Sequence, residues 1–65
     1  MQILYECRGI ALVDTGEDYV VRKDGLPYLY GISTPREAVI SFCTVLEMEM
    51  LRRVERYEEK KKAEL

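Results

Sequence analysis

Three basic residues near the end of the sequence, Arg52, Arg56 and Lys60, recur at intervals of four. On a helix this spacing places side chains on one face, so they would form a basic ridge able to lie along nucleic-acid phosphates. The glutamates Glu55 and Glu59 interleave with this basic ridge, and no aromatic platform accompanies it. The pattern therefore favours a solvated, ion-paired helix face, and nucleic-acid binding is the alternative interpretation.

Catalytic side chains do not form a recognisable set in this sequence. Histidine, the commonest general base, is absent, and no serine or cysteine has a recognisable activating partner. The carboxylates Asp14, Glu17 and Asp18 cluster without the ligand spacing of a calcium loop, which indicates an exposed turn. The four glycines are dispersed, so no phosphate-binding loop is predicted. We expect no catalytic residues, no metal site and no cofactor.

The two cysteines, Cys7 and Cys43, are too few for a disulfide framework or for a structural zinc site. We interpret them as small apolar core residues, with a single disulfide as the alternative. The first residues carry a charge at Glu6 and no long apolar run, so neither a secretory signal nor a membrane span is predicted. We therefore expect a cytoplasmic protein without a membrane partner.

Composition narrows the class of partner. The formal charge of −2 gives no overall attraction to nucleic acid or to anionic lipid. Asparagine is absent and glutamine occurs once, whereas Glu, Lys and Arg dominate the polar residues, which is typical of thermophile proteins. A 65-residue chain buries only about 60% of its unfolded surface, so a further source of stability is expected. Self-association is the common source that the composition leaves open.

One long helix over about residues 34–62 must position most of the candidate residues. Thr34 can cap the free amides, Pro35 suits the first helical position, and Glu37 completes the spacing of a capping box. No glycine or proline follows Pro35. At 1.5 Å per residue the helix would be about 42 Å long, which is well beyond the length of a six-residue strand.

Three strands are predicted before the helix, over about residues 2–14, 18–23 and 26–32. Turns are indicated at Thr15-Gly16 and at Asp24-Gly25, and Gly9 suggests a bulge within the first strand. The expected fold is a single α+β domain, residues 1–65, in which a three-stranded antiparallel meander precedes the helix. Two-residue loops would pair Leu12 with Tyr19 and Val21 with Tyr28.

Both faces of this sheet would be largely apolar. One face would carry Ile10, Leu12, Tyr19, Val21, Tyr28 and Tyr30, and the other Ala11, Val13, Val20 and Leu29. A small antiparallel sheet with one helix should have one polar face. The second face is therefore expected to meet another copy or another protein.

The helix supports the same expectation, because residues 38–46 are apolar almost all round and one sheet cannot surround them. We predict that the chain forms a homo-oligomer, of which a dimer is the favoured form. We also predict that it has no enzymatic activity. The predicted interface residues are Val39, Phe42, Cys43, Leu46, Met50, Leu51, Val54 and Tyr57. The alternative is a small nucleic-acid-binding regulator that uses the basic ridge.

Two short segments resemble the small antitoxin-type HicB domain. They are Leu26-Pro27-Tyr28 and Thr34-Pro35-Arg36-Glu37-Ala38, which match a Leu-Pro turn and a Thr-x-x-Glu-Ala helix start. The chain lacks the usual glycine after Leu-Pro and the strand that returns after the helix. The resemblance implies an antitoxin-like regulator.

Overall fold

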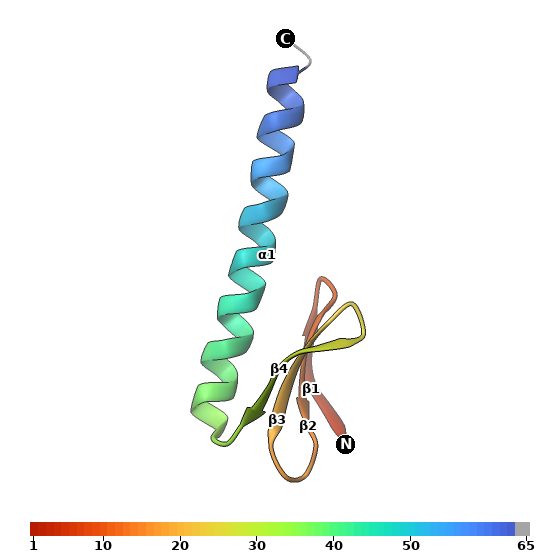
Figure 1. The fold of residues 1–65 in the computed structure, drawn as a ribbon, viewed down its shortest axis with the longest axis vertical. Helices are drawn as coiled ribbons and strands as arrows, with labels where there is room; N and C mark the ends of the chain where they lie inside the picture. Colours follow the sequence, from red (N-terminus) through yellow and green to blue (C-terminus); the bar gives the residue numbers. More distant parts are fainter. Residues whose placement is uncertain (64–65) are drawn as a thin grey trace.

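The computed structural model describes residues 1–63, which form a four-stranded antiparallel sheet and one helix. The sheet has the strand order β1-β2-β3-β4, and α1 lies along one of its faces (Figure 1). The elements are β1 (Gln2–Cys7), β2 (Ile10–Asp14), β3 (Tyr19–Lys23), β4 (Leu26–Ile32) and α1 (Pro35–Ala63). The predicted α+β class, with an antiparallel sheet before a C-terminal helix, is confirmed.

The prediction of one strand over residues 2–14 is wrong. Arg8 and Gly9 form a tight turn between β1 and β2, with φ angles of 53° and 84°, and Cys7 pairs with Ile10 across it. Two positive φ angles are the mark of a type I′ hairpin turn. The usual signals for this turn are Asn-Gly and Asp-Gly, so Arg-Gly between strand-forming residues resembled a bulge. The meander therefore has four strands rather than three.

The tips of the two hairpins are joined at Gly9. The amide of Asp24 donates a 2.8 Å hydrogen bond to the carbonyl of Gly9, which links the β3–β4 turn to the β1–β2 turn. A Cβ atom at Gly9 would lie 2.8 Å from Oδ1 of Asp24. Glycine is therefore required here both by its positive φ and by the close approach of the second hairpin.

The loop between β2 and β3 has four residues rather than the two predicted. Thr15 and Asp18 close it, because the Thr15 amide donates to the Asp18 carbonyl at 3.0 Å and the Thr15 hydroxyl to Oδ1 of Asp18 at 2.6 Å. Asp14 pairs with Tyr19, so Leu12 pairs with Val21 rather than with Tyr19. Since this register differs from the predicted one by two residues, the side chains of β2 and β3 keep their predicted faces.

The pairing of β3 with β4 contains irregularities. Val21 pairs with Leu29 rather than with the predicted Tyr28, and the register shifts on both sides of this pair. Gly31, with a φ of +73°, lies where β4 has one residue more than β3. This arrangement is a β-bulge, and a glycine in the left-handed backbone conformation is common in bulges. The sequence showed the turn before β4 but not the bulges within it.

The core lies between the sheet and the first turns of α1. It contains Ile10, Leu12 and Val21 from the sheet and Ala38, Phe42 and Val45 from the helix, all at most 8% exposed.

The helix starts as its sequence indicates: the Glu37 amide donates to Oγ1 of Thr34 at 3.2 Å, and Pro35 is the first helical residue. These contacts fix the start of α1 against the sheet.

The second face of the sheet offers less apolar surface than predicted. Ala11 and Val13 on this face are 6% and 0% exposed, although α1 lies on the other side. Arg22, which pairs with Ala11, reaches along this face and donates from Nη2 to Sδ of Met1 at 3.2 Å. The chain therefore buries these two side chains itself, and they are not available to a partner.

Candidate interaction surface

The side of α1 that faces the sheet changes character halfway along the helix. Its residues recur at intervals of three and four: Ala38, Phe42, Val45, Glu49, Arg52 and Arg56. The first three are buried and apolar, and the last three are charged. Figure 1 shows α1 continuing far beyond the sheet, and the molecule is 51 Å long but only 19 Å and 15 Å in its other dimensions. The change occurs where the core ends.

Glu49 connects the helix to the sheet at this point. One carboxylate oxygen lies 3.3 Å from Nζ of Lys23 on β3, and the other accepts a 3.2 Å hydrogen bond from Nε of Arg53. Removal from water acts to raise the pKa of Glu49, but the hydrogen bonds and charges of Lys23 and Arg53 outweigh it and lower the pKa. Arg53 also donates to the carbonyl of Arg8 at 3.4 Å. The cluster therefore holds α1 against the β1–β2 turn.

A second line of side chains on α1 is apolar and lies beside the sheet-facing one. This apolar stripe consists of Val39, Cys43, Leu46, Met50, Leu51, Val54 and Tyr57. Leu46 is half-buried, whereas Val39, Met50, Leu51, Val54 and Tyr57 are 42–66% exposed. The stripe extends for about 27 Å from Val39 to Tyr57, or roughly five helical turns. An apolar surface of this length on one helix is typical of a binding face.

Two shallow hollows mark the apolar stripe. One, of about 390 Å³, is lined by Cys43, Leu46, Glu47, Met50, Leu51 and Val54. The other, of about 230 Å³, lies between α1 and β1 and is lined by Tyr5, Leu12, Val39, Phe42 and Cys43. Tyr5 is 67% exposed, and its ring centroid lies 6.4 Å from that of Phe42. The exposed apolar surface is therefore continuous from the edge of the sheet at Tyr5 to the helix.

The predicted interface residues lie on this surface with one exception. Phe42 is 8% exposed and belongs to the core beneath the helix, so it is not available to a partner. Successive side chains on a helix are rotated by about 100°, so Phe42 faces the sheet while Cys43 does not. The interpretation of the cysteines as core residues is also wrong, because Cys7 and Cys43 are both free and exposed. The sequence showed the apolar residues of α1 but not which of them face the sheet.

The basic ridge continues the sheet-facing line beyond the end of the sheet. Arg52, Arg56 and Lys60 are all exposed. Within residues 1–63 the ion pair of this ridge joins Arg52 to Glu49 at 3.9 Å, rather than to Glu55 or Glu59. The ridge therefore presents positive charge on the part of the helix that extends beyond the sheet.

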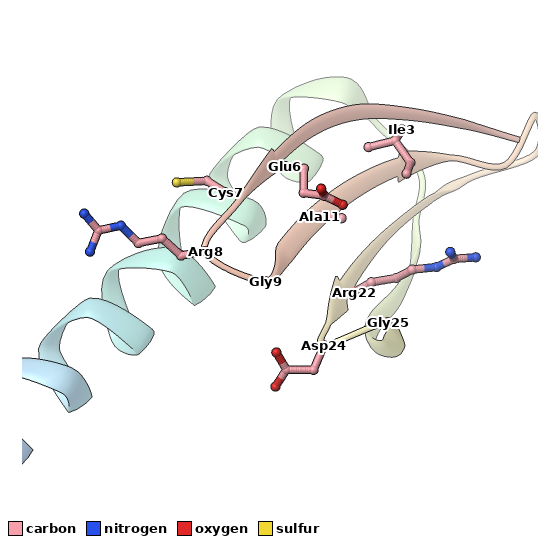
Figure 2. A pocket seen from close by; sticks show the side chains of 9 residues that line it. All are labelled: Ile3, Glu6, Cys7, Arg8, Gly9, Ala11, Arg22, Asp24 and Gly25. Carbon is pink, nitrogen blue, oxygen red and sulfur yellow. The ribbon is translucent and has the colours of Figure 1, made fainter.

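A further hollow, of about 310 Å³, lies on the second face of the sheet near the hairpin tips (Figure 2). Ala11 separates Glu6 on β1 from Arg22 on β3, and its small side chain leaves the space. Nε of Arg22 is buried without a hydrogen-bond partner among the described residues. Figure 2 shows the side chains of Cys7 and Arg8 pointing away from the others. The hollow depends on the unpredicted Arg8-Gly9 turn, so it could not be predicted from local sequence signals.

Within residues 1–63, no group of three or more side chains is arranged to hold a metal ion. Over the same residues, α1 contains no segment of the length and apolarity needed to cross a membrane. The chain was compared with models of protein families, with curated proteins and with solved structures, and none of them matches it.

Proposed function

We propose that this chain is a non-enzymatic interaction domain that self-associates as a dimer through the apolar stripe of α1. The observation that carries the proposal is the exposure of this stripe along about five turns of helix, continuous with Tyr5 at the sheet edge. Its residues are spaced by four, three, four, four and three from Val39 to Tyr57, Leu51 lying beside that line. Spacings of three and four are those with which one helix packs against another.

The length of α1 supports a second copy as the occupant. The part of the helix beyond Glu49 has no contact with the core, and most of the stability of a helix in a protein comes from the packing of its apolar face. Each copy carries both an exposed overhang and an exposed stripe, so one copy can cover the other. Ala11 and Val13 are buried within the chain, so this part of the second sheet face is closed to a partner, whereas the apolar stripe of α1 is open.

A pair of variants tests this proposal. Val54 and Met48 are 53% and 51% exposed, but only Val54 lies on the apolar stripe. Val54→Glu should weaken dimerisation at least tenfold in sedimentation velocity experiments. The interface would bury the new carboxylate without a partner, and burial of an unpaired charge is unfavourable. Met48→Glu should leave the dimer unchanged, since this position lies on the far side of the helix. Equal effects of the two variants, or no effect of either, would contradict the proposal.

The second candidate is a small nucleic-acid-binding regulator that uses the basic ridge. It is supported by the exposure of Arg52, Arg56 and Lys60 on one side of α1. Fluorescence anisotropy with a short DNA duplex at 50 and 200 mM salt tests it, because phosphate contacts weaken steeply with salt. If this candidate is right, the chain binds the duplex more weakly at 200 mM salt, and Arg56→Gln loses the binding. The absence of salt-dependent binding to the duplex would rule the candidate out.

A further inference from the structure

We propose that the two copies pair with their α1 helices antiparallel, so that the basic end of each helix lies against the acidic end of the other copy. This inference rests on the self-association proposed above and names how the partner is oriented. It follows from the distribution of charge along the molecule and from the position of the apolar stripe relative to the sheet.

One end of the molecule is acidic. The loop between β2 and β3 and the start of α1 lie at the same end of the molecule (Figure 1). A small hollow lined by Asp14, Glu17, Asp18 and Ser33 joins the loop to the residues just before the helix. Glu37 in the first turn adds a further carboxylate, and Arg36 is the one basic residue beside it in this turn. This end therefore carries an excess of negative charge.

The other end is basic. Between Arg52 and Lys62 the helix carries six basic residues and three glutamates. The last turn contains Lys60, Lys61 and Lys62. The long axis of 51 Å separates this end from the acidic one, and the Debye length at physiological salt is only about 8 Å. The two ends therefore cannot neutralise each other within one chain.

Helix direction decides which charges meet in a dimer. Parallel helices would bring two basic ends together and two acidic ends together, and like charges across an interface are unfavourable. Antiparallel helices bring each basic end to the partner's acidic end. They also place the helix dipoles in opposite directions, so the partly negative end of one helix lies beside the partly positive end of the other.

The antiparallel arrangement also covers the apolar surface. The second half of one stripe, at Met50, Val54 and Tyr57, would lie against the first half of the partner's stripe, at Val39 and Cys43. Tyr5 at the sheet edge adjoins Val39 and Cys43 and extends this contact. Each exposed helix overhang is then supported by the partner's sheet-bound half, where the helix is held by the core.

The basic ridge acquires a role in this arrangement. The two-fold axis lies perpendicular to both helices, so both sheets are on the same side of the helix pair but at opposite ends. Arg52, Arg56 and Lys60 continue the sheet-facing side of α1. They therefore face the side on which the partner's sheet lies, near its acidic β2–β3 loop. The ridge would bind the carboxylates of a second copy rather than phosphates.

Zero-length carbodiimide cross-linking of the unmodified protein tests this orientation. Amide bonds from Lys60, Lys61 or Lys62 to Glu17, Asp18 or Glu37 are expected, and a mixture of ¹⁴N and ¹⁵N chains identifies them as intermolecular. These groups lie at opposite ends of one chain, so the links cannot form within it. Sedimentation of the same sample, before cross-linking, reports whether a dimer is present.

A distance measurement gives an independent readout. The background is Cys7→Ala, Cys43→Ala, and because Cys43 lies on the apolar stripe, sedimentation must first show that this background forms the same dimer as the unmodified chain. A spin label at Lys62→Cys should then give a label separation of about 40 Å, estimated from the helical rise over 14 residues on each side of the stripe's centre. A dimer with labels less than about 20 Å apart and without the end-to-end cross-links would overturn the antiparallel orientation while leaving self-association in place. A protein that sediments as a monomer would overturn both proposals.

Discussion

The carboxylate of Glu49 lies 3.3 Å from the ammonium group of Lys23, and this ion pair joins α1 to β3 where the apolar core ends. The pair marks the boundary between the part of the helix that the sheet supports and the part that extends beyond it. Arg53 binds the same carboxylate and the carbonyl of Arg8, so the link reaches the β1–β2 turn as well.

Stability should fall in acid because of this cluster. The pKa of Glu49 is lowered on folding, so its contribution is present above the ordinary glutamate pKa and is lost as the pH falls through the folded-state pKa. The free energy of unfolding, measured between pH 7 and 3, should decrease less steeply in Glu49→Gln than in the unmodified chain. Identical pH profiles for the two proteins would contradict a role of this ion pair in stability.

Substitution of Gly9 should destabilise the fold more than substitution of Gly16. Both have positive φ, at 84° and 96°, but only at Gly9 would a Cβ atom meet another residue, Oδ1 of Asp24 at 2.8 Å. Gly9→Ala should cost the roughly 1–2 kcal/mol of a left-handed alanine and an additional steric term. Gly16→Ala should cost only the conformational term. Urea unfolding of both variants at one protein concentration measures the difference, and an equal loss would argue against the close approach.

Removal of the helix cap should weaken the start of α1. The Thr34 hydroxyl accepts a hydrogen bond from the Glu37 amide at 3.2 Å, and Thr34→Ala removes it. A loss of about 1 kcal/mol is expected, as for other N-cap substitutions. Ser33→Ala is the matched control, because Ser33 precedes the cap and is also exposed. Thermal unfolding followed by circular dichroism checks this, and a control as damaging as Thr34→Ala would mean that the cap is not the cause.

The helix beyond the sheet should owe its order to association. Amides between Arg52 and Lys62 have no core beneath them, so in a monomer they should exchange with solvent far faster than the amide of Val45. Their protection should increase with protein concentration as the dimer forms, while that of Val45 changes less. Protection that does not depend on concentration would show that this segment is stable without a partner.

Local signals gave a good account of the helix. Thr34, Pro35 and Glu37 act on neighbouring backbone atoms, so their effect can be read from the sequence alone. The Asp24-Gly25 turn was equally clear for the same reason. The Arg8-Gly9 turn was missed because arginine rarely takes a positive φ, and its conformation is held by the bond from Asp24 to Gly9, a contact distant in sequence.

The orientation of individual side chains depended on packing and could not be predicted in the same way. Phe42 and Cys43 are adjacent apolar residues in a segment that is apolar almost all round, yet Phe42 faces the core and Cys43 is exposed. The burial of Val13 similarly depends on tertiary arrangement, with Arg22 crossing that face to reach Met1. The apolar stripe could be predicted as a set of residues, but its boundary with the core required the structure.

Sedimentation equilibrium of the unmodified chain is the decisive test of self-association. We predict a species of twice the 7.6 kDa chain mass at micromolar concentration, which dissociates on dilution. Circular dichroism of the same samples should show helix content decreasing with the dimer fraction. A folded monomer of 7.6 kDa throughout the micromolar range, with full helix content, would rule out the proposed dimer.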